Sequence, residues 1–239
     1  MDEHILQALR QGVLTLKGEF VHGLNYSFLA EVESAGRTFL AVYKPTEGEQ
    51  PLWDFPEGTL AHREVAAYLV SEALGWHLVP PTVYRPQAPF GPGSLQQFIP
   101  HDPNRHYFTL TADERQRLLK PVALFDHVVN NADRKGSHLL FDENDRLWLI
   151  DHGICFHVED KLRTVIWDFV DQPVPRRLRA DLERLLALLE SPSELVAALE
   201  QHLAPEEIAA LARRTADFAR RPTFPPPPSD RRAYPYPPL

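Results

Sequence analysis

Two short polar stretches contain the side chains that are best suited to chemistry. Asp133 lies within residues 130–138, which follow an apolar stretch, and Asp151 comes directly after the apolar residues 147–150. Carboxylates on loops that rigid elements anchor are typical of sites that handle a metal ion together with phosphate groups. One carboxylate can orient a hydroxyl nucleophile, and the other can hold Mg²⁺ against the phosphates. The pattern therefore indicates phosphoryl chemistry.

Each stretch also has a purely structural interpretation. A polar loop after a helix, or an Asp at the end of a strand, often does no more than cap neighbouring backbone groups. The two stretches together, with a hairpin between them, are more specific than either one alone. Their combination favours the metal–phosphate interpretation.

The elements on either side of the two carboxylates follow from sequence periodicity. A capping-box pattern at residues 111–114 opens a helix that ends near Asn130, and Pro121 within it predicts a kink. Two short strands, 139–141 and 147–150, are joined by a polar turn. A helix and a hairpin would thus hold the two loops.

The first hundred residues have mainly the patterns of strands and turns. A short amphipathic helix over residues 1–11 comes first, and a helix over residues 60–74 ends at Gly75, where a C-cap belongs. Residues 45–58 have little periodicity and are predicted as a loop. The predicted strands, which begin with a three-stranded antiparallel meander, cover residues 13–20, 26–33, 38–44, 82–84 and 94–99.

The last part of the chain is helical and then rich in proline. After residue 175 the pattern is helical, with Pro192 and Pro205 expected at first helical positions. Residues 222–239 contain eight prolines, which predicts an extended, polyproline-type tail that is not a packed element. Tyr234 and Tyr236 could anchor it on the protein's surface, or the tail could bind a partner.

These elements predict an α+β fold with two lobes. We expect an antiparallel, β-rich N-lobe over residues 1–100, a mainly helical C-lobe over residues 101–221, and the extended tail over residues 222–239. Such an arrangement places a ligand cleft between the lobes.

A lysine in the third predicted strand points to the same cleft. Lys44 ends the apolar segment 39–43 and is one of only five lysines in the chain. By the alternation of a strand, Lys44 points inward if Val42 does. The alternative is an ordinary lysine at the end of a strand.

The motifs as a set resemble those of the protein-kinase-like superfamily. Residues 131–134 (Asn-Ala-Asp-Arg) and 150–153 (Ile-Asp-His-Gly) are similar to the catalytic loop and the metal motif of its atypical branch. That branch contains type II phosphatidylinositol 4-kinases, other phosphatidylinositol 3- and 4-kinases, and HipA-like bacterial kinases. The sequence looks like an actinobacterial member of it, and the resemblance covers about residues 12–170.

The resemblance implies a bilobal kinase fold, ATP as a cofactor, and Mg²⁺ or Mn²⁺. Under it, Asp133 with Arg134 forms the catalytic loop and Asp151 holds the metal. The resemblance also implies three groups of nucleotide-binding residues. Lys44 and its acidic partner Glu64 form the first, and Asn25 and Ser27 of the phosphate-binding turn form the second. Gln97, Phe98 and Ile99 of the hinge form the third. The alternative for Glu64 is an ordinary solvated glutamate on a helix face. The alternative for the phosphate-binding turn is an ordinary hairpin turn.

One position departs from the pattern of the family. The second metal ligand is usually an Asn five residues after the catalytic Asp, where this sequence has His138. A neutral imidazole binds divalent metals but prefers softer ions than Mg²⁺. Either His138 is a ligand with an altered metal preference, or the second metal position is degraded.

Composition limits the classes of function. The net charge is −8, which argues against a general nucleic-acid binder. Cys155 is the single cysteine, so neither an internal disulfide nor a cysteine-based zinc site is possible. The chain has no signal-peptide pattern and no apolar run long enough to span a membrane. A cytoplasmic location is the simplest expectation.

The sequence leaves three functions open. The first is an ATP-dependent phosphotransferase whose acceptor is a protein hydroxyl or a small molecule rather than a phosphoinositide, because the chain is acidic and lacks a lipid anchor. The second is a nucleotide-binding pseudokinase that acts as a regulatory module. The third, an adaptor that works through the Pro-rich tail, fits poorly with the retained Lys44, Asp133 and Asp151.

Overall fold

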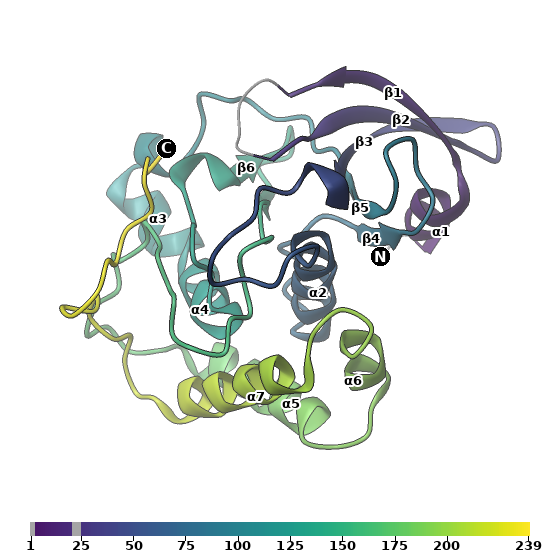
Figure 1. The fold of residues 1–239 in the computed structure, drawn as a ribbon. Coiled ribbons are helices and arrows are strands. Elements are labelled where there is room, and N and C mark those ends of the chain that lie inside the picture. The colour runs from purple at the N-terminus through teal and green to yellow at the C-terminus, as the bar shows by residue number, and fades with distance from the viewer. Residues whose placement is uncertain (1–2, 21–24) are drawn as a thin grey trace.

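The structure is a computed structural model that describes residues 3–20 and 25–239. Its two parts are an antiparallel sheet with flanking helices and a larger helical part with a small hairpin (Figure 1). The helices are α1 (Glu3–Gln11), α2 (Leu60–Ala73), α3 (Ala112–Leu118), α4 (Lys120–Val129), α5 (Arg176–Leu189), α6 (Glu194–Leu199) and α7 (Pro205–Arg220). The predicted α+β, bilobal architecture is confirmed.

The large sheet has five strands in the order β1-β2-β3-β5-β4, all antiparallel. Its strands are β1 (Val13–Glu19), β2 (Phe28–Ser34), β3 (Arg37–Pro45), β4 (Thr82–Arg85) and β5 (Gly93–Gln97). Strand alternation buries Ala41 and Tyr43 of β3 completely in a core that includes Leu9 of α1. Val42 and Lys44 therefore point to the other face of the sheet.

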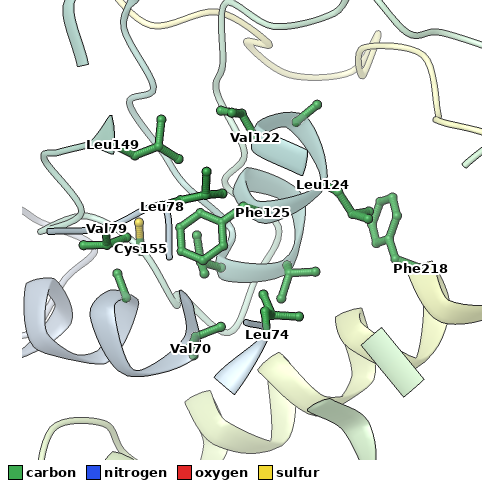
Figure 2. Close-up of a cluster of buried hydrophobic side chains, with 14 of the residues drawn as sticks. Val70, Leu74, Leu78, Val79, Val122, Leu124, Phe125, Leu149, Cys155 and Phe218 are labelled. Carbon is green, nitrogen blue, oxygen red and sulfur yellow. The ribbon is translucent and has the colours of Figure 1, made fainter. Parts of the chain in front are cut away.

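A second, larger core lies in the helical part. Figure 2 shows Val70 of α2 and Leu74, directly after that helix, packed with Phe125 of α4 and with Cys155, which is completely buried. This core also takes in the hairpin of β6 (Leu139–Phe141) and β7 (Leu147–Leu149). Because α2 also contacts β4 and β5, its side chains join the sheet to the helical part.

Proline changes two of the predicted helix boundaries. The helix expected from residue 111 to Asn130 is two helices, α3 and α4, and Pro121 lies in the first turn of α4. Proline cannot donate the i→i−4 hydrogen bond, so it starts a new helix here instead of kinking one. Pro192 is outside its helix, because α6 begins at Glu194 with Ser193 as the N-cap, whereas Pro205 begins α7 as predicted.

The Pro-rich tail is extended but packs on the body, so the expectation of an unpacked tail is wrong. Phe224 is only 3% exposed and packs on Phe169, with ring centroids 5.5 Å apart. Tyr234 and Tyr236 are not the anchors, since they are 50% and 79% exposed. Backbone hydrogen bonds from Gly136 to Pro238 and from Thr164 to Ala233 hold the far end of the tail, which runs toward α3 (Figure 1).

This packing makes the tail a source of stability. We expect Phe224→Ala to cost about 3 kcal/mol or more, the usual effect of emptying a buried aromatic site. For a protein of this size the melting temperature should fall by roughly 6 °C or more. Tyr236→Ala is the matched control and should leave the melting temperature nearly unchanged. Equal, small shifts in both variants would mean that the tail does not stay on the body in solution.

Across residues 3–20 and 25–239, none of the helices combines the length and the hydrophobicity that crossing a membrane requires.

Candidate active site

A cleft of about 250 Å³ lies between the sheet and the helical part. It collects most of the residues that the sequence pattern singled out. Lining it are Asn25, Ser27, Lys44, Glu64, Asp133, His138 and Asp151, together with Tyr26, Pro45, Glu49, Gln50, Leu52, Leu60, Ala61, Lys135, Gly153 and Ile154. Side chains from β3, α2 and both polar loops therefore meet in one place.

Lys44 links the two walls of this cleft. Its Nζ lies 2.5 Å from Glu64 Oε1 and 2.5 Å from Asp151 Oδ1. Lys44 lies one residue before the end of β3, Glu64 lies on α2, and Asp151 follows β7. The side-chain alternation in β3 thus brings Lys44 to the cleft, where two carboxylates from distant parts of the chain pair with it.

Hydrogen bonds from the backbone fix Glu64 and the start of the helix that carries it. The second oxygen of Glu64 accepts a hydrogen bond from the backbone N–H of His152, at 2.9 Å. At the start of α2, Glu49 accepts hydrogen bonds from the N–H groups of Leu60 and Ala61. A carboxylate at a helix N-terminus satisfies otherwise unpaired donors and interacts favourably with the helix dipole. The helix that carries Glu64 is thereby tied to the loop at Asp151.

The charges of this network stabilise one another. Burial would raise the pKa of Asp151, but the Lys44 ammonium and the neighbouring His138 outweigh this effect and hold that pKa well below its usual value. Burial would likewise lower the pKa of Lys44, but the charges of Asp151 and Glu64 raise it. Asp151 also has its backbone in the left-handed region, with φ 59°, a conformation that costs energy in a residue other than Gly and is frequent at functional sites.

Asp133 faces the same cleft from the loop after α4. Its backbone N–H donates to Asn131 Oδ1 at 2.9 Å, which shapes the loop, and one of its carboxylate oxygens lies 3.4 Å from Lys135 Nζ. Burial raises the pKa of the Asp133 carboxyl, while the Lys135 ammonium opposes the shift. A carboxylate with a raised pKa and one free face is suited to accept a proton.

Arg134 does not reach the cleft, which corrects the expectation of a catalytic role for it. Its side chain is completely buried, and its Nε donates to both oxygens of Asp126, at 3.0 and 3.2 Å. The guanidinium also donates to the carbonyl of Ile150, directly before Asp151. Arg134 therefore joins the loop of Asp133 to the loop of Asp151 from behind, as a positioning residue.

The hydrogen bonds of His138 bear on its expected role as a metal ligand. Its Nδ1 accepts from the backbone N–H of Lys135 at 3.3 Å, and its Nε2 lies 3.2 Å from Asp151 Oδ2. Burial lowers the pKa of His138 to about 3, so the ring is neutral. When Nδ1 is the acceptor, the single ring proton is on Nε2 and points at Asp151.

A divalent metal therefore fits Asp151 better than it fits His138. A carboxylate oxygen suits Mg²⁺ or Mn²⁺, whereas the lone pair that His138 would need on Nε2 is protonated in this arrangement. Within the described residues, no group of three or more His, Cys, Asp or Glu side chains is arranged to hold a metal ion. Phosphate oxygens would have to complete the coordination, as is usual for Mg²⁺.

The nucleotide-binding residues are only partly brought together. Ser27 and Asn25 line the cleft, but Asn25 Oδ1 accepts from the backbone N–H of Gln50 at 2.7 Å. The predicted phosphate-binding turn begins with Gly23 and Leu24, directly before Asn25, and these two residues lie outside the described ones.

None of the three predicted hinge residues, Gln97, Phe98 and Ile99, lines the cleft of Lys44. The N–H groups of Gln97 and Phe98 donate to the carbonyls of Pro81 and Leu40, and Ile99 is buried beneath the hairpin. Adenine binding at this segment stays a prediction.

Sequence reasoning missed three residues that build the site. Lys135 lines the cleft beside Asp133, and its place two residues after that carboxylate could have drawn attention to it. Asp126 was visible as a lone acid in the apolar helix α4. Glu49 had no signal, because it lies in a loop of low periodicity and reaches α2 only in the folded chain.

Comparison with known sequences gives a clear match. Residues 58–220 match the sequence model of the family described as phosphatidylinositol 3- and 4-kinase. This range differs at both ends from the expected extent of residues 12–170: it begins after Lys44, and it includes the helical end up to residue 220. The chain is also 37% identical to Protein Rv2133c of Mycobacterium tuberculosis, over 99% of this chain and 95% of that protein.

Two solved kinase-like structures have the same fold. The structure of hydra Fam20 with sugar has a TM-score of 0.58 at 15% identity, and the match covers 90% of this chain and 86% of that one. The Golgi casein kinase with Mn/ADP bound has a TM-score of 0.52 at 17% identity, over 91% and 74% of the two chains. Because the family match covers most of the chain and the fold agrees with it, this protein is a member of the phosphatidylinositol 3- and 4-kinase family with an atypical kinase fold.

Proposed function

We propose that this protein is an ATP-dependent phosphotransferase. The observation that carries the proposal is the contact of Lys44 Nζ with both Glu64 and Asp151, in a cleft that Asp133 also lines. In kinases a lysine–glutamate pair holds the nucleotide phosphates, one aspartate binds the metal, and a second aspartate meets the acceptor hydroxyl. Membership of the kinase family supports the same assignment.

Each residue has a defined part in the proposed reaction. Lys44, oriented by Glu64, binds the α- and β-phosphates, and Asp151 is the carboxylate that would hold Mg²⁺ or Mn²⁺. The metal, when bound, neutralises charge on the phosphates. The oxygen of the acceptor hydroxyl bonds to the γ-phosphorus, and Asp133 accepts the proton that this hydroxyl loses. The bond from that phosphorus to the bridging oxygen breaks, and ADP leaves with the electron pair.

The acceptor is proposed to be a protein hydroxyl or a small molecule. The chain has a net charge of −8, which is unfavourable at an anionic membrane surface. Of the basic residues that follow the metal motif, Arg163 donates to the carbonyl of Ala132 and Lys161 lies near Asp54 and Glu159. These two cations are therefore engaged within the protein.

A pseudokinase is the second candidate, and His138 is the observation that favours it. Asp151 has one oxygen on Lys44 and the other near His138 Nε2. A metal ion would have to displace one of these contacts. A protein that binds nucleotide and transfers nothing would keep the Lys44 network for structural reasons.

One experiment separates the two candidates. The full chain is incubated with γ-labelled ATP, Mg²⁺ or Mn²⁺, and cell lysate, while ATP binding is measured in parallel by calorimetry. Metal-dependent label on a protein or small molecule, absent with Asp133→Asn, supports the phosphotransferase. Binding of ATP with no transfer in any condition supports the pseudokinase, and no ATP binding contradicts both.

Metal preference tests the side chain at position 138. We expect His138→Asn to raise the ratio of the Mg²⁺-dependent rate to the Mn²⁺-dependent rate by about tenfold, because an amide oxygen offers a hard ligand where the protonated Nε2 of His138 offers none. His4→Asn, on the exposed face of α1, serves as the control. Equal Mg²⁺-dependent rates in wild type and His138→Asn would mean that this side chain does not affect the metal.

A further inference from the structure

A second cavity, of about 300 Å³, lies in the helical part and is separate from the cleft of Lys44. Its walls come from α4, α7, the segment after the metal motif and the Pro-rich tail. The lining includes His127, Trp167, Phe218, Pro225, Pro226 and Pro228 on the apolar side. This volume is in the usual range for small-molecule sites, and neither the fold nor the proposed reaction uses it.

The polar lining of this cavity carries an excess of positive charge. Four arginines face it, at positions 213, 214, 221 and 231, against two aspartates at positions 160 and 217. Arg221 pairs with Asp217 at 2.7 Å, and Arg231 pairs with Asp160 at 2.6 Å. Each aspartate thus already has its own arginine. Arg213 and Arg214 remain without such a carboxylate partner among the described residues.

Arg214 is held in place and still has unused donors. Its Nε donates to the carbonyl of Val128 at 2.9 Å, and its Nη1 donates to the carbonyl of His157 at 3.2 Å. Its Nη2 is buried and has no hydrogen-bond partner within the described chain. A buried, unpaired guanidinium nitrogen is costly, and because Arg214 lines the cavity, an anion bound there would supply the missing acceptor.

Aromatic side chains form the other side of the cavity. The ring of His127 lies against Phe218, with centroids 4.6 Å apart, and edge-on to Trp167 at 5.7 Å. Burial lowers the pKa of His127 to about 4, so this ring adds no charge. The indole N–H of Trp167 donates to the carbonyl of Ala233 in the tail, which fixes the ring. A flat apolar group can pack here while an anion meets Arg214.

We propose that this cavity binds a small molecule that has an apolar ring and an attached phosphate or carboxylate group. Arg214 and Arg213 bind the anionic group, and the rings of Trp167 and Phe218 together with the tail prolines contact the apolar part. The proposal is independent of the reaction proposed for the cleft.

Calorimetric titration of the full chain with phenyl phosphate tests this proposal. We expect saturable one-site binding, weakened about tenfold or more in Arg214→Gln and in Arg213→Gln. Arg220→Gln is the matched control, because Arg220 lies exposed on the same helix and does not line the cavity. Lys44→Met reports on the other anion site, in the cleft, and should leave this binding unchanged. Parallel titrations with benzoate and phenol show whether phosphate or carboxylate is preferred and whether the charge is needed.

Several outcomes would overturn the proposal. It is wrong if phenyl phosphate does not bind, if phenol binds equally well, or if Lys44→Met alone abolishes binding. Arg214→Gln also loses two hydrogen bonds to backbone carbonyls, so its melting temperature is measured beside the wild type. If that variant is unfolded, Arg213→Gln decides, since the side chain of Arg213 is exposed at the cavity. Unchanged affinity in Arg213→Gln would then contradict the assignment.

Discussion

Asp133→Asn is expected to bind ATP as the wild type does and to transfer its phosphoryl group about 10²- to 10⁴-fold more slowly, the range that a positioned acid–base group contributes. The amide has the same shape as the carboxylate but cannot accept the proton of the acceptor hydroxyl. Asp133 makes no contact with Lys44 in the structure, and its loop is set by Asn131 and by the buried Arg134, so nucleotide binding should survive the change. Rapid-quench transfer assays and calorimetry with ATP measure the two properties separately.

Asp113→Asn is the matched control for this variant, because Asp113 is an exposed aspartate in the first turn of α3. Its transfer rate should equal that of the wild type. A wild-type rate in Asp133→Asn would remove Asp133 from the reaction. A parallel loss of ATP affinity would mean that Asp133 organises the cleft rather than the acceptor.

Asp151→Asn is expected to have a larger effect than Asp133→Asn. Its transfer rate should be undetectable, and it should lose the metal-dependent part of its affinity for ATP. Asp151 is the one carboxylate that both lines the cleft and follows β7, and its pKa is held low by Lys44 and His138. A neutral amide is a weak ligand for a hard divalent cation. It also leaves Lys44 with Glu64 as its remaining carboxylate partner. ATP titrations with Mn²⁺ and with EDTA separate the metal-dependent part of binding from the rest.

In the wild type, EDTA should weaken ATP binding, and in Asp151→Asn it should make little difference. The fold should tolerate the change, since the side chain of Asp151 lines the cleft and is not part of a hydrophobic core. Metal-dependent binding that persists in Asp151→Asn would assign the metal to other residues. Loss of the folded state instead would mean that the ion pair with Lys44 is structural, and Lys44→Met should then unfold the protein as well.

The sequence predicts the elements of this fold closely where the signal is local. The five strands of the sheet and the helix α2 lie within a few residues of their expected positions, because strand alternation, capping residues and Gly75 act on neighbouring residues. The meeting of Lys44, Glu64, Asp133 and Asp151 in one cleft was implied by the resemblance of their motifs to those of the kinase-like superfamily.

The direction and partners of several side chains were decided by tertiary contacts alone. Arg134 is adjacent to Asp133 in sequence, yet its guanidinium points inward because Asp126, eight residues earlier, is buried and needs a counter-ion. His138 donates toward Asp151 because the backbone N–H of Lys135 occupies its other nitrogen. No periodicity in the sequence encodes these choices.

The Pro-rich tail is the clearest case of this division. Its composition correctly predicts an extended chain, since proline fixes φ and lacks an N–H group. Composition could not predict that Phe224 would bury its ring against Phe169, or that the carbonyl of Pro238 would accept from Gly136 in the loop that carries Asp133. Local conformation follows from each residue's own backbone preferences, whereas packing depends on surfaces that form only when distant segments of the chain meet.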